Sequence, residues 1–257
     1  MDVSGVLLTA VRPDMGGTHV GPDGLRVCDE CGRPREMVGE FMGARMRLPV
    51  MCACQERERA REDAREKRQK ADRRAAIAFP VPAMRGMTFG ASDGRSARQM
   101  GMCRRYADAL PAPGHGLVLT GPPGCGKTYA AACIANAALD RGLSVRVWSV
   151  PRLVDGLDRE DEAAIARADL VVLDDLGAER DTSYGLEGVW RAVDTRALSG
   201  KPMVVSTNRT VREMVAADSV GWQRVYDRVL GACLPVAFEG VPRGDGERWA
   251  RWAAALS

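Results

Sequence analysis

Residues 121–128 read Gly121-Pro-Pro-Gly-Cys-Gly-Lys127-Thr128, which fits the spacing G-x-x-x-x-G-K-[ST]. A short apolar run, 117–120, precedes this stretch, and a segment rich in helix-forming residues, 129–139, follows it. Strand, glycine-rich loop and helix in this order are the context in which such a spacing forms a phosphate-binding loop. The stretch therefore predicts a nucleoside triphosphate site built on an α/β core.

The loop residues have distinct expected roles. The backbone N–H groups of such a loop surround the phosphates, and the dipole of the following helix adds positive potential. Lys127 is expected to reach the β and γ phosphates of ATP, and Thr128 to offer its hydroxyl to Mg²⁺. The alternative is a glycine turn with an incidental lysine, which the flanking strand and helix disfavour. The expected ATP-contacting residues are Gly121, Pro122, Pro123, Gly124, Cys125, Gly126, Lys127, Thr128, Tyr129 and Asp174.

Apolar runs and helix-forming segments alternate on both sides of this loop. The runs 117–120, 144–148, 170–173, 203–206 and 233–238 predict five strands, and the segments 95–110, 129–139, 151–166 and 186–198 predict helices. Alternation of this kind predicts a mainly parallel five-stranded sheet with helices on both faces.

Two adjacent acids end the third predicted strand. Asp174 and Asp175 follow Leu170-Val-Val-Leu173, so they are expected at the carboxyl edge of the sheet, where open α/β folds bind ligands. Asp174 is the candidate to hold Mg²⁺ through water, and Asp175 the candidate to orient or deprotonate the attacking water. A solvated strand end is the alternative.

Polar residues also end the fourth predicted strand, where Ser206-Thr207-Asn208 follow Met203-Val-Val. Asn208 is a candidate to hold the nucleophilic water or to sense the γ-phosphate. Taken alone, Ser-Thr-Asn after a strand is only a loop start. The neighbouring acids and glycine-rich loop favour the functional interpretation.

Two arginines, Arg224 and Arg228, lie four residues apart in a helical stretch and so share a face. In a head-to-tail assembly either could reach the γ-phosphate bound by a neighbouring copy. Arg228 is the first candidate and Arg224 the second. An intramolecular ion pair with the adjacent Asp227 is the alternative.

Four of the eight cysteines cluster near the N-terminus as C-x2-C and C-x-C, separated by twenty residues: Cys28, Cys31, Cys52 and Cys54. Two close thiolate pairs suit a tetrahedral zinc ion, with Gly32 allowing a tight turn after the first pair. Neither histidine, His19 or His115, belongs to the cluster, which favours a closed structural site. Four unrelated buried or oxidised cysteines are the alternative.

The remaining sequence suggests the domain order. Residues 1–24 are rich in Gly, Pro and Asp and are expected to form a flexible arm, and 25–54 a zinc-binding module. The charged run Gln55–Ala76 lacks Gly and Pro and predicts a connector helix within 55–78. The solvated connector is favoured over a nucleic-acid or partner surface, and the ATPase domain is expected over 79–257.

Bulk properties exclude several classes. The formal net charge is +3, with 37 basic against 34 acidic residues, which is too small to indicate a nucleic-acid partner by itself. No run reaches the roughly 18 apolar residues of a membrane span. Met1-Asp-Val-Ser-Gly5 also lacks the basic start of a secretory signal. We therefore expect a cytoplasmic protein without membrane contact.

Together these motifs resemble the AAA+ helicase loaders of the DnaC and DnaI type, including phage versions, over roughly 28–240. More particular marks are Phe79-Pro-Val-Pro-Ala-Met-Arg-Gly-Met-Thr-Phe89, Leu173-Asp-Asp-Leu-Gly-Ala178, Lys201-Pro202 and Ser206-Thr-Asn208. The four-cysteine module looks like the zinc-bearing N-terminal domain of some loaders. Arg228 falls where that family places its trans-acting arginine, and only about 19 residues follow Phe238, too few for a C-terminal helical lid.

This resemblance implies ATP-controlled binding to a hexameric replicative helicase and its delivery onto single-stranded DNA during DNA replication, with self-association through the ATPase domain. ATP, Mg²⁺ and Zn²⁺ are the implied cofactors. The expected activity is Mg²⁺-dependent ATP hydrolysis that is slow and stimulated by assembly. Glu is commoner than Asp at the base position in related ATPases, so the shorter Asp175 leaves the rate of turnover open.

Three other functions stay open. An IstB-type transposition helper shares the ATPase core but usually has a helical N-terminal part without a cysteine cluster. A zinc-dependent adaptor would bind nucleotide with weak or no hydrolysis. A small-molecule kinase is disfavoured by the polar end at Asn208 and the lack of an acceptor lid.

Overall fold

The computed structural model describes residues 8–9, 17–41, 43–111, 115–153, 157–177, 183–239 and 254. The chain divides into two compact units, Met1–Lys70 and Ala71–Ser257. Helix α1 (Ala53–Ala78) contains the point of division between Lys70 and Ala71. No helix among the described residues is long and apolar enough to cross a membrane.

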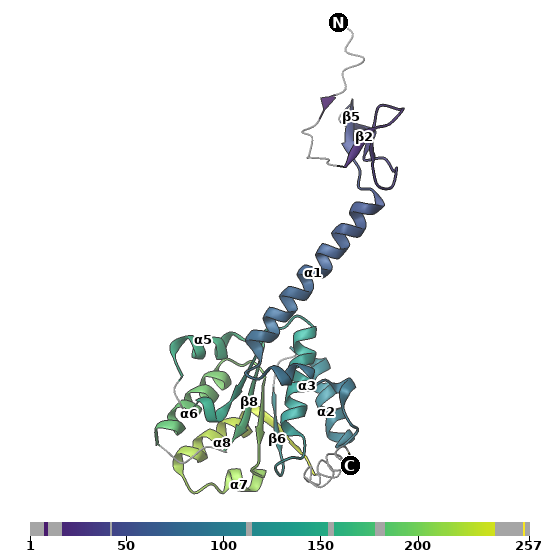
Figure 1. Cartoon of the computed structure of the whole chain (residues 1–257). Coiled ribbons are helices and arrows are strands. Elements are labelled where there is room, and N and C mark those ends of the chain that lie inside the picture. The colour runs from purple at the N-terminus through teal and green to yellow at the C-terminus, as the bar shows by residue number, and fades with distance from the viewer. Residues whose placement is uncertain are drawn as a thin grey trace. The chain divides into compact units, whose positions relative to one another are not determined.

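The first unit is built from short strands (Figure 1). Strands β2 (Thr18–Val20) and β3 (Arg26–Cys28) form an antiparallel hairpin. A second sheet has the order β1-β5-β4, formed by β1 (Leu8–Thr9), β5 (Ala44–Pro49) and β4 (Glu36–Phe41). The expected flexible arm over 1–24 is therefore wrong for Thr18–Val20 and for Leu8–Thr9, which pair as strands.

The hairpin turn explains this difference. The N–H of Gly21 donates to the carbonyl of Leu25 (2.8 Å) and the N–H of Gly24 to that of Gly21 (2.9 Å), while Gly24 adopts a φ of 75°. Gly, Pro and Asp are the residues that tight turns require, as well as those that loose segments contain. Composition alone does not distinguish the two.

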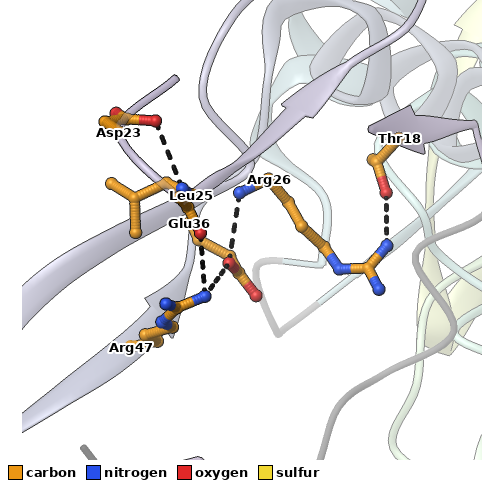
Figure 2. A network of polar contacts seen from close by, with 7 residues as sticks. Thr18, Asp23, Leu25, Arg26, Glu36 and Arg47 are labelled. Atoms are coloured by element: carbon orange, nitrogen blue, oxygen red, sulfur yellow. Dashed lines mark hydrogen bonds and ion pairs between the residues drawn. The ribbon is translucent and has the colours of Figure 1, made fainter. Parts of the chain in front are cut away.

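Polar contacts connect the strands of the first unit (Figure 2), whose described residues form no large apolar core. The buried carboxylate of Glu36 accepts a hydrogen bond from the N–H of Arg26 (3.2 Å) and pairs with Arg47 (3.7 Å). Arg47 also donates to the carbonyl of Gly24 (3.0 Å), and the Arg26 guanidinium to the Thr18 hydroxyl (2.9 Å). Small modules bury too little apolar surface to be stable by packing alone, so such contacts matter more there.

The second unit contains a five-stranded sheet in which every pair is parallel, as predicted. Its order is β10-β6-β9-β8-β7. The strands are β6 (Gly116–Thr120), β7 (Val145–Ser149), β8 (Leu170–Leu176), β9 (Met203–Thr207) and β10 (Cys233–Ala237). The predicted strands lie within one residue of these at most ends. Strand β8 is the exception, since it continues three residues beyond Leu173.

Helices cover both faces of this sheet (Figure 1). Leu117, Leu119 and Val172 face the core beneath α2 (Ala97–Ala109) and α3 (Lys127–Asp140). Val118 and Val171 face the opposite core, beneath α5, α6 and α8. Side chains on a strand alternate between faces, so strands covered on both sides become continuous apolar runs. The bounds of these helices are α5 (Arg159–Arg167), α6 (Ser183–Leu198) and α8 (Val220–Ala232).

The predicted helix over 151–166 is two helices. Helix α4 (Val150–Leu153) ends early, and α5 begins after Asp158, whose carboxylate accepts the N–H groups of Glu160 and Asp161 (both 2.8 Å). This N-cap is the sequence signal for a new helix start. A second start lies at Thr210, which caps α7 (Val211–Val215) with Glu213 in a reciprocal capping box.

Two short 3₁₀ helices follow α1 within the second unit: η1 (Pro82–Gly86) and η2 (Phe89–Ala91). The buried Asn136 of α3 donates to the carbonyls of Met84 and Met87 (both 2.9 Å), which fixes η1 against α3. The C-terminal tail with Trp249 and Trp252 lies outside the described residues.

Candidate nucleotide site and cysteine cluster

The loop between β6 and α3 has the backbone shape that its glycines permit. Gly121, Gly124 and Gly126 have positive φ angles of 144°, 78° and 100°. A Cβ at Gly121 would lie 2.3 Å from the carbonyl oxygen of Phe238. That distance leaves no room for a side chain at position 121. Glycine at this position therefore allows the backbone to pass close to Phe238 as the loop leaves β6.

Lys127 begins α3 and is 5% exposed. Its ammonium donates to the carbonyls of Gly121 and Pro122 (both 2.8 Å) and lies 3.6 Å from the Cys125 sulfur. The loop's own carbonyls therefore satisfy this buried charge. The ammonium is already directed into the loop that the sequence predicts to hold phosphates.

Thr128 and Asp174 meet across the carboxyl edge of the sheet. The Thr128 hydroxyl donates to Oδ1 of Asp174 at 3.0 Å, although the two residues are 46 positions apart. Burial raises the pKa of Asp174, and Ser206, Thr128 and Lys127 oppose that rise. A hydroxyl beside a buried carboxylate is a suitable oxygen pair for Mg²⁺.

Asp175 and Asn208 lie at the same edge. Asp175 is half-buried and has a φ of 64°, the left-handed region that side chains other than glycine rarely adopt. Its N–H donates to the Ser206 hydroxyl (2.9 Å). Asn208 is exposed and comes directly after β9. Tyr129 points elsewhere, since its hydroxyl donates to the carbonyl of Thr88 (2.9 Å).

Both candidate arginines lie on α8. Arg228 pairs with Asp194 of α6, with Nε 3.1 Å from Oδ1, and its guanidinium carbon lies 5.8 Å from the centre of the Trp190 ring. The predicted alternative partner, Asp227, is not the residue it contacts. Arg224 lines a surface hollow of about 530 Å³ with Met214 and Leu230.

The four N-terminal cysteines come together in the first unit. Their sulfur atoms all lie within 4.8 Å of one another, and they form the only such metal-type group among the described residues. Four sulfurs around tetrahedral zinc, each about 2.3 Å from the metal, stand about 3.8 Å apart. Cys28 and Cys52 are buried, and Cys31 and Cys54 are partly exposed. The donor set and its closeness fit a closed zinc site.

The turn after Cys28 has the form of a metal-binding knuckle. The N–H of Gly32 donates to the Cys28 carbonyl (2.9 Å), the Cys28 N–H donates to the Arg33 carbonyl (2.9 Å), and Gly32 has a φ of 67°. Hydrogen bonds from the backbone of Cys31 and Glu30 lower the pKa of Cys28 to about 7. Burial, with Cys31 and Glu30 nearby, raises the pKa of Cys54 to about 12. Thiols this close cannot all ionise without a cation between them.

Three residues that sequence reasoning did not select belong to these sites. Ser206 bridges Asp174 and Asp175, while Asp194 and Trp190 hold Arg228. The position of Ser206 at the end of β9 was a usable signal, since polar residues at that edge face the acids. Asp194 and Trp190 offered none, because they are distant from Arg228 in sequence.

Comparison with known proteins agrees with this fold. The family model described as IstB-like ATP binding protein matches residues 50–241, more than half of the chain. The replicative helicase loader DnaC of Escherichia coli (strain K12) is 29% identical over 146 residues, covering 52% of this chain and 58% of DnaC. A putative ATP-binding protein in an insertion sequence of Mycobacterium tuberculosis is also 29% identical over 146 residues, covering 53% of this chain and 57% of that relative.

The matches span less than two thirds of these relatives. A crystal structure of DnaI has the same fold, with a TM-score of 0.56 at 22% identity, and the match covers 66% of this chain and 99% of that one. The chain is homologous to the helicase loaders DnaC and DnaI, and its core is an AAA+ P-loop fold. It belongs to the family of IstB-like ATP binding proteins.

Proposed function

We propose that this protein is an ATP-dependent loader of a hexameric replicative helicase. The observation that carries the proposal is the four-cysteine cluster in the same chain as an ATP-binding core homologous to DnaC and DnaI. In this proposal the cysteine module, with zinc bound, selects the helicase. The ATPase core contacts single-stranded DNA and neighbouring copies of itself.

The contacts at the carboxyl edge support Mg²⁺-dependent ATP hydrolysis. Lys127 would exchange the carbonyls of Gly121 and Pro122 for the β and γ phosphates, which gives its buried charge an anionic partner. Thr128 and Asp174 would hold Mg²⁺ through the oxygens that now face each other. Bound Mg²⁺ supplies charge neutralisation of the phosphates. Asp175 would orient or deprotonate the attacking water, and Asn208 would sense the γ-phosphate.

The domain order 1–24, 25–54, 55–78 and 79–257 is part of this proposal, with the hairpin residues from Thr18 joined to the zinc module. The connector helix is almost entirely exposed, and only Ala78 in it is buried. Such a helix suits a link between a partner-selecting module and an ATPase, because its exposed polar surface is compatible with solvent and includes the ion pair of Glu66 with Lys70.

A transposition helper is the second candidate. The family description and the insertion-sequence relative favour it, and that relative matches as well as DnaC does. The cysteine cluster favours the loader, because the helper type usually lacks one. A zinc-dependent adaptor without useful hydrolysis is a third function to test.

The full chain, purified without chelator, can be immobilised and offered the replicative helicase of its host or phage and, separately, a transposase. Retention of the helicase, lost in Cys52→Ala, supports the loader; retention of the transposase alone supports the helper. Retention of neither, with no ATP hydrolysis, supports the adaptor.

Hydrolysis is measured in the same preparation with Lys127→Ala, which should abolish it. Lys201→Ala is the matched control, because Lys201 also donates to a backbone carbonyl, that of Arg167 (2.5 Å), but lies before β9, at the opposite edge of the sheet. Equal rates in wild type and Lys127→Ala would remove the enzymatic part of the proposal.

A further inference from the structure

Strands β8 and β9 lose their register at the two acids. Leu173 pairs with Val205, and the next pair is Leu176 with Thr207. Two residues of β8, Asp174 and Asp175, therefore stand opposite the single residue Ser206 of β9. This is the two-against-one count of a β-bulge, a feature that redirects side chains and occurs often beside active sites.

The bulge explains the backbone of Asp175. One residue of such a bulge often adopts the left-handed conformation, usually as glycine, and here Asp175 does so with a φ of 64°. Asp tolerates this region better than longer acids do. Because the ladder is interrupted, the N–H of Asp175 donates to the side chain of Ser206 (2.9 Å).

The single hydroxyl of Ser206 makes a hydrogen bond to the backbone of Asp175 and another to the carboxylate of Asp174. It accepts from the N–H of Asp175 and donates its proton to Oδ1 of Asp174 at 2.5 Å. The residue is fully buried, so no water replaces either contact. Oδ1 of Asp174 thus receives hydroxyl groups from β9 and from Thr128 of α3 at the same time.

We propose that Ser206 is a positioning residue for the magnesium site and for the attacking water. Its hydroxyl fixes the Asp174 carboxylate toward Thr128 and holds the bulge that sets the direction of Asp175. It also joins both acids to β9, which ends at Thr207, directly before Asn208. This inference rests on the proposed ATP hydrolysis. Partners that orient a metal-binding carboxylate commonly change metal affinity or activity 10–100-fold when removed.

The test uses Ser206→Ala in the full chain. The Mg²⁺ concentration that half-saturates ATP hydrolysis should rise about tenfold. The gain in ADP affinity on adding Mg²⁺ should shrink in the same variant, while affinity in EDTA stays as in wild type. Ser206→Thr, which keeps the hydroxyl, should restore the Mg²⁺ dependence.

Ser144→Ala is the matched control. Ser144 also donates its hydroxyl to an aspartate, Asp169 (2.7 Å), and accepts that residue's N–H (3.0 Å), but it does so at the opposite edge of the same sheet. Its removal should lower the melting temperature without altering the Mg²⁺ dependence. A structural role alone would make the two serine variants behave alike.

The outcomes separate this inference from the proposed function. If wild type hydrolyses ATP and Ser206→Ala has the wild-type Mg²⁺ dependence, the positioning role is overturned and the proposed function stands. If wild type binds nucleotide without hydrolysing it, the gain in ADP affinity on adding Mg²⁺ decides the role of Ser206. A smaller gain in Ser206→Ala than in wild type supports the role, and an equal gain overturns it. If wild type binds no nucleotide, the proposed function fails and the role of Ser206 fails with it. If the Ser206→Thr chain does not fold, the Mg²⁺ dependence of Ser206→Ala against Ser144→Ala decides the role.

Discussion

Arg228 and Asp194 form an ion pair between two helices, with Nε of the arginine 3.1 Å from Oδ1 of the aspartate. The arginine also packs over the Trp190 ring, and its side chain remains 48% exposed. An arginine fixed by a carboxylate and an aromatic face loses less conformational freedom when it binds a further anion. This geometry suits a group that acts on the nucleotide of a neighbouring copy.

We expect Arg228→Ala to lower ATP turnover of the self-associated chain by about a thousandfold, the range found for trans-acting arginines. Arg224→Ala should lower it far less, and Asp194→Asn should have an intermediate effect because the guanidinium loses its fixed direction. Steady-state phosphate release, measured across protein concentrations, gives these rates.

A mixture of two inactive variants tests whether Arg228 acts on the nucleotide bound by a neighbouring copy. Arg228→Ala keeps an intact site, and Asp175→Asn keeps an intact arginine, so an equal mixture of the two inactive chains should regain turnover. An inactive mixture, from chains that still associate, would assign Arg228 to its own subunit.

The second prediction concerns Asp175, where we expect the longer Glu side chain to lower both turnover and stability. Asp175→Glu should lower turnover about tenfold and destabilise the fold by about 1 kcal/mol, because a longer side chain is less tolerated at its φ of 64°. Asp175→Gly, which relieves the backbone, should not destabilise. Thermal unfolding and turnover at saturating Mg²⁺ test this. A faster and equally stable Asp175→Glu chain would contradict the strain argument.

The sequence predicted the parts of the site that depend on local pattern. The glycine-rich loop, the acids after Leu173 and the two cysteine pairs each occupy a few neighbouring residues, and the strands that carry them are continuous apolar runs. Parallel strands bring their carboxyl ends to one edge, so Thr128 and Asp174 had to lie close together.

The remaining features depend on tertiary pairing. The bulge at Asp174 and Asp175 needs Ser206 from another strand, so the apolar run alone predicts a strand that ends at Leu173. Asp227 was the predicted alternative partner of Arg228, but adjacent residues of a helix point in different directions, and the partner comes from α6 instead. The residues of the β2–β3 turn resemble those of a loose arm until strand pairing is known.

The cysteine cluster supplies a third prediction. Natively purified protein should contain one zinc per chain, and Cys28→Ala or Cys52→Ala should remove it. Cys103→Ala is the control, because Cys103 is fully buried in the core of the second unit. Elemental analysis gives the ratio, and wild-type protein without zinc would contradict the prediction.

Zinc removal should act on the first unit alone. Metal that binds only the folded module stabilises it, and small modules of this size lack a core to replace that contribution. Chelation should therefore expose residues 17–52 to protease while residues 97–237 stay protected, as read by mass spectrometry of the fragments. Simultaneous cleavage of both regions would argue against independent modules.

Arg196 supplies the last prediction, at the edge of the sheet opposite the nucleotide loop. It is fully buried on α6, and its guanidinium donates to the carbonyls of Ile165, Ala168, Asp169 and Pro202 at 2.6–3.2 Å. Burial lowers its pKa to about 10. These four carbonyls belong to the end of α5 and to the segments leading into β8 and β9, so one side chain joins three elements.

We expect Arg196→Met, which keeps much of the volume, to destabilise the protein by about 3 kcal/mol, because several buried carbonyls lose their donors. Arg196→Lys should recover only part of that, since a single ammonium cannot reach all four oxygens. Arg191→Ala is the control on the same helix; its partly exposed ion pair with Glu162 should contribute at most about 1 kcal/mol. Urea unfolding measures all three. The affinity for ATP should stay unchanged in each folded variant, because Lys127, Thr128 and Asp174 lie at the other edge of the sheet. A loss of ATP binding in folded Arg196→Lys would show that the two edges are coupled.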